Sequence, residues 1–408
     1  MSAPAPAPTA SPRLVSLDAL RGFDMFWILG ADVLVQALRA LSDAAPVRLL
    51  ATQLEHKAWH GFAFYDLIFP LFVFIVGVSL VFSLSRARET TSRGALVGKI
   101  LRRAAILFLL GLLYNGGLAQ PWPEVRIVGV LQRIAIVYAI CGILFCWLKP
   151  RALAATGVAI LLGYWALMAW TPIRDLTLQT ETLAAQLGVE NPTREQVEPL
   201  FAATTERTRG HYEPGLNVAN HVDFAWLPGR MYNRYFDPEG IVSTLPAVVT
   251  GLLGVLAGVW LRRRDLSDTQ KTRGLLAGGG AAVALGWLWH LGGFPVNKQL
   301  WTSSFVLVAG GWSLGLLAAF YWVVDVRQQQ GWCRPFVWIG TNPITLYLAT
   351  SLVSFGGIAH RIAGGSVEQA LDRAVTPGFG QFVLALLTLS LLVGLAAFLY
   401  RRKIFLKV

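Results

Sequence analysis

Long apolar runs dominate the chain and recur along its whole length. A helix needs about 20 apolar residues to cross the hydrocarbon core of a bilayer. Ten runs of this kind are present: 14–38, 63–85, 100–118, 127–148, 152–170, 241–261, 274–291, 302–324, 335–356 and 379–400. The pattern predicts an all-α protein, a polytopic membrane helical bundle of about ten transmembrane helices. Pro343 interrupts the ninth run, which is therefore the least regular of the predicted helices.

A long polar segment divides the runs into two groups. Residues 14–170 hold the first five predicted helices and 241–408 the last five. Residues 171–240 are too long for a simple connection, so we expect a small structured extracytoplasmic cap there. Residues 1–13 are rich in Pro and Ala and lack the charged start and apolar core of a signal peptide. They are expected to form a disordered cytoplasmic tail.

Composition agrees with a membrane protein, and charge gives its orientation. The chain is 55% hydrophobic and only 14% charged, with a net charge of +12. Nucleic-acid binding is excluded because the basic residues form short clusters between apolar runs, as the positive-inside rule predicts. These clusters follow the second, fourth, sixth, eighth and tenth runs: Arg86, Arg88, Arg93, Lys99, Arg102 and Arg103; Lys149 and Arg151; Arg262, Arg263, Arg264, Lys271 and Arg273; Arg327 and Arg334; Arg401, Arg402, Lys403 and Lys407.

The charge pattern and the even number of helices place both termini in the cytoplasm. The loops before the second and sixth runs then lie on the outer side, which is periplasmic in a bacterium. Three cysteines are present without metal-ligand spacing, so we expect no metal site.

Residues 54–70, LEHKAWHGFAFYDLIFP, carry the most suggestive chemistry. His56 and His60 precede the second apolar run, and Asp66 stands near its start. An imidazole at the boundary between water and lipid is suited to proton transfer near neutral pH. Asp66 has two readings that the sequence leaves open. It is either a helix-start acid favoured by the helix dipole or the partner that orients a histidine.

Several ionisable residues lie inside apolar runs, where an unpaired charge is costly. Asp18, Arg21, Asp24 and Asp32 share roughly a third of the circumference of the first helix. They form either a structural ion-pair network or the polar wall of a channel for substrate or cofactor. Gln132 and Arg133 lie in the fourth run, where Arg133 either serves a site or extends to the membrane surface.

Further polar residues lie at the outer ends of later runs. Asp237 and Glu239 precede the sixth run, Asn297 and Lys298 precede the eighth, and Asn342 lies in the ninth. Each alone is more often a cap or turn residue. Together, at compatible depth, they are candidates for lining one cavity on the outer side.

Six motifs in this order resemble the heparan-α-glucosaminide N-acetyltransferase family of transmembrane acyltransferases. They are SLDALRGFD (16–24), HKAWHGFAFYDLIFPLFVFIVG (56–77), RIVGVLQR (126–133), FDPEGI (236–241), PVNKQLW (295–301) and VVDV (323–326). We expect a bacterial-type member that lacks the additional N-terminal luminal domain and first helix of the animal enzymes. That difference makes lysosomal targeting and a heparan substrate doubtful.

The resemblance implies transfer of an acetyl group from cytoplasmic acetyl-CoA to an amino sugar or glycan end across the membrane. It implies a catalytic role for His56, in an H-x-x-W segment with Trp59, and for Asp66 in D-L-x-F-P. His56 would act as a general base or as an acetyl carrier. The resemblance also implies a homodimer. The short N-terminus without a targeting segment leads us to expect a bacterial inner membrane.

Other residues receive expected roles from charge, depth and resemblance together. Arg102 and Arg103 are candidate anchors for the CoA phosphates, although the positive-inside rule alone explains them equally well. The expected substrate-contacting residues are Asp18, Arg21, Asp24, Trp59, His60, Gln132, Arg133, Glu239, Asn297, Lys298 and Asn342.

Two other functions compete with the acetyltransferase. A transporter for a sugar or sugar acid also fits ten helices, a Pro-interrupted helix and buried charges. The absence of a convincing internal repeat between the two halves argues against it. A non-catalytic membrane scaffold leaves the buried charges unexplained.

Overall fold

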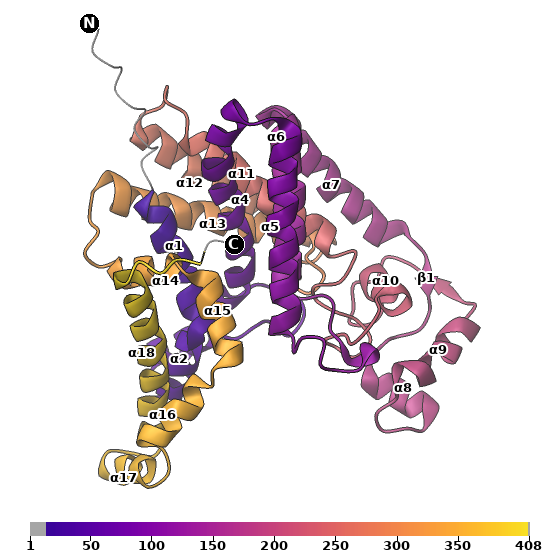
Figure 1. Cartoon of the computed structure of the whole chain (residues 1–408). Helices are drawn as coiled ribbons and strands as arrows, with labels where there is room; N and C mark the ends of the chain where they lie inside the picture. Colours follow the sequence, from indigo (N-terminus) through magenta and orange to yellow (C-terminus); the bar gives the residue numbers. More distant parts are fainter. Residues whose placement is uncertain (1–13, 407–408) are drawn as a thin grey trace, which may run out of the picture.

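The computed structural model describes residues 14–406, so the predicted disordered tail 1–13 lies outside the described residues. The all-α polytopic fold class is confirmed (Figure 1). The helices of the bundle are α1 Val15–Phe26, η1 Trp27–Ala31, α2 Asp32–Leu41, α3 Ala45–Gln53, α4 Phe64–Thr90, α5 Arg93–Tyr114, α6 Val130–Trp147, α7 Pro150–Trp170, α11 Thr244–Leu261, α12 Asp268–Leu291, α13 Ser303–Phe320, η3 Tyr321–Val326, α14 Arg334–Gly340, α15 Pro343–Leu352, α16 Phe355–Ala363, α17 Ser366–Ala374 and α18 Phe379–Arg401.

Seven of the ten predicted runs form helices that are long and apolar enough to cross a membrane. They are α4, α6, α7, α11, α12, α13 continued by η3, and α18. The other three runs are helical but differ from straight apolar spans. The first bends at Gly30, whose φ of 111° interrupts the regular helix. The third, in α5, carries Arg102 and Arg103, and Pro343 divides the ninth into α14 and α15.

Helix α4 lies at the centre of the bundle, where it contacts α1, α6, α11 and α13. Two glycines allow α4 and α11 to approach closely. A Cβ on Gly77 would collide with the carbonyl of Gly251, and a Cβ on Gly254 would collide with that of Phe74. Small residues of this kind bring backbones together where lipid supplies no hydrophobic drive for helix association. The close contact holds the start of α4, which carries Asp66, against the start of α11.

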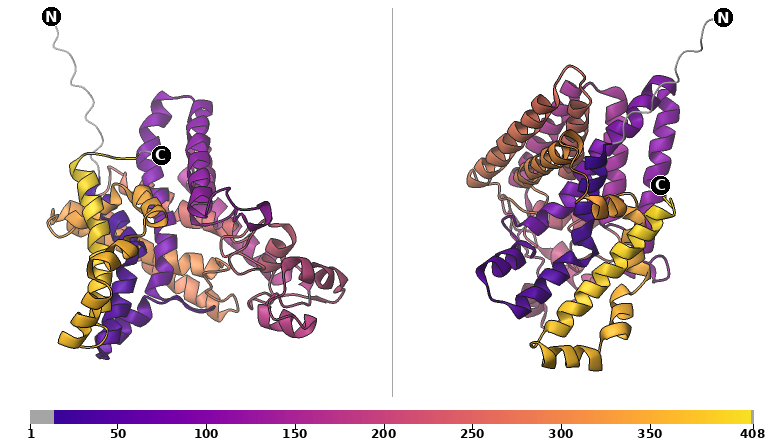
Figure 2. Two further views of the ribbon diagram at one scale, coloured as in Figure 1. Left: turned by 60° about the horizontal axis from the view of Figure 1, so that its bottom comes forward. Right: turned by 90° about the vertical axis from the view of Figure 1, so that its left-hand side faces the viewer.

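The segment between α7 and α11, which we call the cap, is folded into short helices and two short strands. It contains α8 Thr180–Leu187, α9 Arg194–Ala203, α10 Val218–Trp226 and an antiparallel pair of two-residue strands, β1 Ile173–Arg174 and β2 Arg207–Thr208. A short helix, η2 Trp122–Glu124, lies in the loop before α6. The left view in Figure 2 shows the cap on one side of the molecule and α18 on the other.

The cap and the basic clusters lie at opposite ends of α4. The start of α4 adjoins the loop that carries His56. At the other end of α4, Arg88 lines a pocket together with Pro150, at the start of α7, and Arg262, just after the end of α11. The end of α4, the start of α7 and the end of α11, which adjoin the basic clusters after the second, fourth and sixth runs, therefore lie near one another. The assignment of this end of α4 to the cytoplasm remains a prediction.

Candidate active site

His56 and Asp66 are in direct contact. His56 lies in the loop before α4, and its Nδ1 is 2.9 Å from Asp66 Oδ1 in the first turn of that helix. The Asp66 carboxylate is buried and also accepts hydrogen bonds from the backbone N–H groups of Ala63 (3.0 Å) and Lys57 (3.3 Å). Both readings of Asp66 therefore apply, because one carboxylate caps the helix and binds the histidine. With a proton on Nδ1, this contact leaves Nε2 as the free base.

Lys298 joins this pair from the loop between α12 and α13. Its Nζ lies 3.1 Å from His56 Nδ1, 3.3 Å from Nε2 and 3.7 Å from Asp66 Oδ1. Burial lowers the pKa of Lys298, while the charges of Asp66 and Glu239 oppose that shift. The sequence predicts Lys298 only as an acceptor contact. The fold instead places its amine against the predicted catalytic histidine.

Two neighbouring contacts hold the His56 loop in place. The Tyr65 ring packs on the His56 imidazole with 4.7 Å between ring centroids, and its hydroxyl donates to Asp32 at 2.9 Å. The loop also pairs with the Lys298 loop, because the N–H of Gly61 donates to the carbonyl of Val296 at 2.8 Å. Gly61 has a φ of 113°, a conformation that favours glycine. The two loops therefore form one support for His56 and Lys298.

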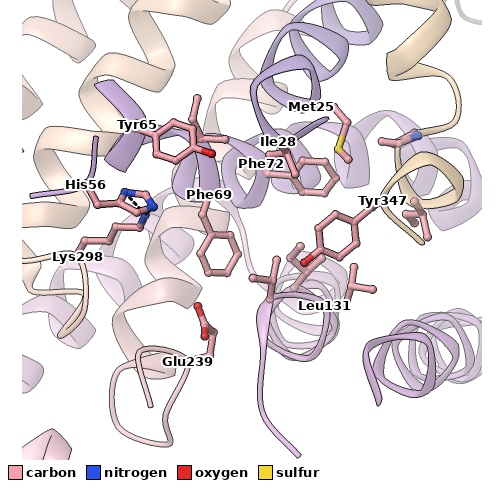
Figure 3. Close-up of a pocket in the computed structure, with 15 residues that line it drawn as sticks. Met25, Ile28, His56, Tyr65, Phe69, Phe72, Leu131, Glu239, Lys298 and Tyr347 are labelled. Carbon is pink, nitrogen blue, oxygen red and sulfur yellow. Dashed lines mark hydrogen bonds between the residues drawn. The ribbon is translucent and has the colours of Figure 1, made fainter. Parts of the chain in front are cut away.

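Three adjoining cavities lead from the cap into the bundle. The outer cavity, about 310 Å³, is lined by His56, Trp59, Asp66, Arg126, Arg133, Tyr232, Glu239, Lys298 and Trp301 among others. The middle cavity, about 240 Å³, shares His56, Glu239 and Lys298 with it and is mainly apolar. Figure 3 shows His56 and Lys298 together at one end of the middle cavity, with Met25 and Tyr347 at the other.

The inner cavity, about 340 Å³, continues this route toward the basic end of the bundle. It shares Phe72, Leu131, Ile134, Pro343 and Ile344 with the middle cavity. Its polar lining includes Arg21, Ser79, Arg103 and Tyr138. The three cavities thus adjoin one another: one lined by several charged side chains under the cap, a mainly apolar one beside His56, and one that contains two arginines.

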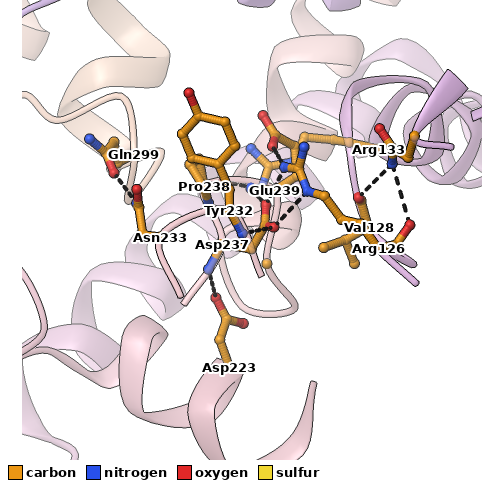
Figure 4. A network of polar contacts seen from close by, with 12 residues as sticks. Arg126, Val128, Arg133, Asp223, Tyr232, Asn233, Asp237, Pro238, Glu239 and Gln299 are labelled. Carbon is orange, nitrogen blue, oxygen red and sulfur yellow. Dashed lines mark hydrogen bonds and ion pairs between the residues drawn. The ribbon is translucent and has the colours of Figure 1, made fainter. Parts of the chain in front are cut away.

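A buried network of charges ties the loop before α6 to the loop before α11 (Figure 4). The Arg126 guanidinium donates to both carboxylate oxygens of Asp237 at 2.9 and 2.8 Å, and to Glu239 at 2.8 Å. Burial raises the pKa of Glu239, and the nearby arginines oppose the shift. Burial also raises the pKa of Asp223, in α10, to about 7. Asp223 accepts hydrogen bonds from the backbone of Asp237 and Ile241, so it supports the same loop from the cap side.

Arg133 does not extend to the membrane surface. It is 1% exposed and donates to the carbonyl of Pro238 at 2.6 Å and to the Ser243 hydroxyl at 2.5 Å. Its guanidinium lies 4.9 Å from the centre of the Trp301 ring. Arg133 therefore fixes the loop that presents Glu239, and it lines the outer cavity.

The polar stripe of the first helix separates into different environments. Arg21 donates to the Ser79 hydroxyl at 2.6 Å and to the carbonyl of Gly340 at 3.2 Å, and it lies 3.5 Å from Asp18. It lines the inner cavity, so this part of the stripe is a cavity wall. Asp24 is fully buried, and neither of its carboxylate oxygens has a hydrogen-bond partner.

The two candidate CoA anchors also differ in position. Arg103 lines the inner cavity, with its guanidinium 4.9 Å from the centre of the Tyr138 ring. Arg102 is exposed and lines none of the three cavities. Of the two, only Arg103 is placed to contact a molecule in the inner cavity.

Six predicted substrate contacts line none of the three cavities: Asp18 and Asp24 of the first helix, His60, Gln132, Asn297 and Asn342. His60 lies 3.8 Å from Glu213 of the cap and 3.5 Å from the Asn297 amide. The Asn297 side chain shapes its own turn by accepting from the N–H of Leu300 at 2.8 Å. Gln132 is buried, and its amide packs so closely against Gly111 that a Cβ at that position would collide with it. His60 and Asn297 therefore link neighbouring loops, and Gln132 packs beside Gly111.

Asn342 is the last of the six, and it lies beside the inner cavity and not the outer one. Its amide donates to the carbonyl of Ile404 at 3.0 Å and accepts from the N–H of Leu406 at 3.3 Å. The reason is the break at Pro343, which turns Asn342 toward the C-terminal segment. Asn342 therefore holds Leu406 beside the inner cavity, which Leu406 helps to line.

Sequence reasoning missed three residues of the site. Arg126 is the first residue of the RIVGVLQR motif but precedes the apolar run. The pattern of apolar residues therefore did not mark it as a charge inside the bundle. Asp223 and Tyr232 belong to the cap, where short polar segments carry no periodic pattern. Within residues 14–406, no group of three His, Cys, Asp or Glu side chains is arranged to hold a metal ion.

Comparison with known proteins finds similarity to one family. Residues 13–202 match the family model described as heparan-alpha-glucosaminide N-acetyltransferase, catalytic. Heparan-alpha-glucosaminide N-acetyltransferase of Mus musculus is 29% identical over 328 residues, covering 72% of this chain and 48% of that protein. The Homo sapiens protein is 29% identical over 323 residues, with the same two shares.

The chain spans about half the length of the curated relatives it matches. The family-model match includes His56, Asp66 and Arg126, whereas Glu239 and Lys298 lie beyond it. The resemblance seen in the motifs is thereby confirmed, and the chain is similar to the heparan-α-glucosaminide N-acetyltransferases over the matched residues.

Proposed function

We propose that this protein is a transmembrane acetyltransferase. It moves the acetyl group of cytoplasmic acetyl-CoA to the amine of an amino sugar or glycan end on the outer side of the membrane. The observation that carries this proposal is the position of the His56–Asp66 pair. It lies where a cavity lined by several charged side chains under the cap adjoins a mainly apolar cavity, which in turn adjoins the cavity that contains Arg21 and Arg103.

The inner and middle cavities suit the donor. Arg21 and Arg103 offer guanidinium groups to the phosphates of CoA, for which arginine is a good partner. The apolar walls of the middle cavity, among them Phe69, Phe72 and Tyr347, suit the narrow pantetheine arm. The thioester would then reach His56 from the inner side.

The outer cavity suits an amino sugar. Glu239 supplies a carboxylate for its ammonium group. Trp59, Tyr232 and Trp301 supply aromatic faces for its ring. Acceptor and donor would therefore approach His56 from opposite sides, as transfer across a membrane requires.

The transfer needs one proton movement that His56 can perform. As the sugar amine attacks the thioester carbonyl, Nε2 of His56 removes a proton from the amine. The C–N bond forms, the C–S bond breaks, and the proton passes from His56 to the CoA thiolate. Asp66 holds the ring orientation and stabilises the imidazolium that forms. An acetyl-His56 intermediate satisfies the same geometry and stays open as an alternative.

The direct test uses purified protein, labelled acetyl-CoA and glucosamine. We expect labelled N-acetylglucosamine to form with protein and not in its absence. If the protein transferred no acetyl group to any amino sugar, the proposal would be contradicted. Uptake of unmodified sugar into proteoliposomes without acetyl-CoA would support the transporter instead.

The orientation is part of the proposal and has its own test. We propose that the protein lies in a bacterial inner membrane with both termini in the cytoplasm. The exposed Glu190 lies in the cap, and the three native cysteines are buried. In a Glu190→Cys variant, an impermeant thiol reagent should therefore label the introduced cysteine once the outer face is accessible, before lysis. Labelling only after lysis would reverse the orientation.

A homodimer is also proposed, and it rests on the resemblance alone. Mass measurement of the purified protein in detergent by light scattering gives its oligomeric state directly. A monomer as the only active species would rule the dimer out.

A further inference from the structure

The amine of Lys298 stands where the proposed reaction needs an acceptor amine. Its Nζ is 3.1 and 3.3 Å from the two ring nitrogens of His56. The side chain is 23% exposed and lines both the outer and the middle cavity. Figure 3 shows it beside His56 at the end of the middle cavity, where the thioester of the donor would arrive.

The position of Nζ also suits proton removal. The Nδ1–H bond and the Nε2 lone pair diverge in the ring plane, so an Nζ nearly equidistant from both nitrogens lies over the ring. A small side-chain rotation would bring it into line with Nε2, while Asp66 retains Nδ1. Burial lowers the pKa of Lys298 and so increases its share of free, nucleophilic amine. Asp66 and Glu239 act against this by favouring the ammonium form.

We propose that Lys298 is a self-acetylation site, modified by acetyl-CoA when no acceptor amine occupies the outer cavity. This inference rests on the proposed function only in that acetyl-CoA reaches His56. The Nζ lone pair attacks the thioester carbonyl, forming a C–N bond as the C–S bond breaks. His56 takes the proton from Nζ and passes it to the departing CoA thiolate. The products are free CoA and an N-acetylated lysine.

Self-acetylation has a consequence for the enzyme. An amide is too stable to pass its acetyl group to a sugar amine, so the modified protein is a terminal product. It has lost the cation beside Asp66 and carries an acetyl group in the space between the outer and middle cavities. The modification therefore inactivates the protein, and an acceptor amine protects it by competing for the same acetyl group.

The test incubates the purified full-length protein with acetyl-CoA and no acceptor, followed by peptide mass spectrometry. We expect the peptide with Lys298 to gain one acetyl group as activity declines. Lys57 is a matched control because it lines the same outer cavity but is exposed. It should stay unmodified. Glucosamine should slow the modification, and a His56→Asn variant should slow it roughly 100-fold, as expected for loss of a general base.

Each other outcome is decisive. Equal acetylation of Lys57 and Lys298, or undiminished labelling in a folded His56→Asn variant, would show ordinary solution chemistry and overturn the inference. A Lys298→Arg variant gives a second check, since the label must not move to another lysine. Acetylated glucosamine with unmodified Lys298 would remove this inference and leave the proposed function. Acetylated Lys298 without transfer to any amino sugar would keep the inference and remove the amino-sugar acceptor.

Discussion

Replacing His56 by alanine is expected to lower the rate of acetyl transfer by roughly two to four orders of magnitude. The variant removes the base that takes the proton from the attacking amine. Asp66 would keep its bonds to the backbone of Lys57 and Ala63, so the helix start stays capped. The thermal unfolding midpoint and acetyl-CoA binding should therefore change little. Steady-state transfer to glucosamine, measured beside a binding isotherm for acetyl-CoA, separates these effects.

His60 provides the matched control for this prediction. It lies four residues further along the same loop and contacts Glu213 and Asn297, outside all three cavities. A His60→Gln variant should lose less than about tenfold in rate, because it loses no proton-transfer group. Equal losses in both variants would mean that the loop, and not the His56 imidazole, limits the reaction.

Replacing Arg126 by methionine is expected to destabilise the protein by about 3 kcal/mol or more. The change leaves Asp237 and Glu239 without their shared guanidinium, and Asp237 is only 2% exposed. Removing one partner of a buried ion pair costs more than the pair contributes, because the remaining charge stays buried. Activity should fall as well, since Glu239 lines the outer cavity. Thermal unfolding in detergent measures the first effect.

The exposed pair Arg263–Asp265 is the control for Arg126. Both side chains are open to solvent, where an ion pair contributes little. An Arg263→Ala variant should therefore leave the unfolding midpoint within experimental error. If Arg126→Met also left the midpoint unchanged, the buried network would not hold the cap to the bundle.

Much of the architecture was predictable because apolar length and charge act locally. Runs of about 20 apolar residues mark helices wherever they occur, and the basic clusters order their ends. The contact between His56 and Asp66 was also predictable, because only a short loop separates these residues along the chain. The helix bounds were less predictable. Gly30 and Pro343 signal breaks, but they do not give the direction in which the chain continues.

The remaining features of the site depend on segments far apart in the sequence. Lys298 meets His56 across a separation of 242 residues. Arg133 is buried because Pro238 and Ser243, from the second half of the chain, accept its hydrogen bonds. Asn342 binds the C-terminal segment for a similar reason. None of these partners is visible from local pattern.

By itself, the sequence determined the membrane class, the helical segments, the grouping of basic ends and the candidate histidine with its acid. These properties follow from apolar length and from charge, which each segment carries independently of its neighbours. Only the tertiary structure decided that Lys298 lies against His56, that Arg126 joins Asp237 to Glu239, and that the three cavities adjoin. The physical reason is that each of these depends on how loops from separate helix pairs pack under the cap.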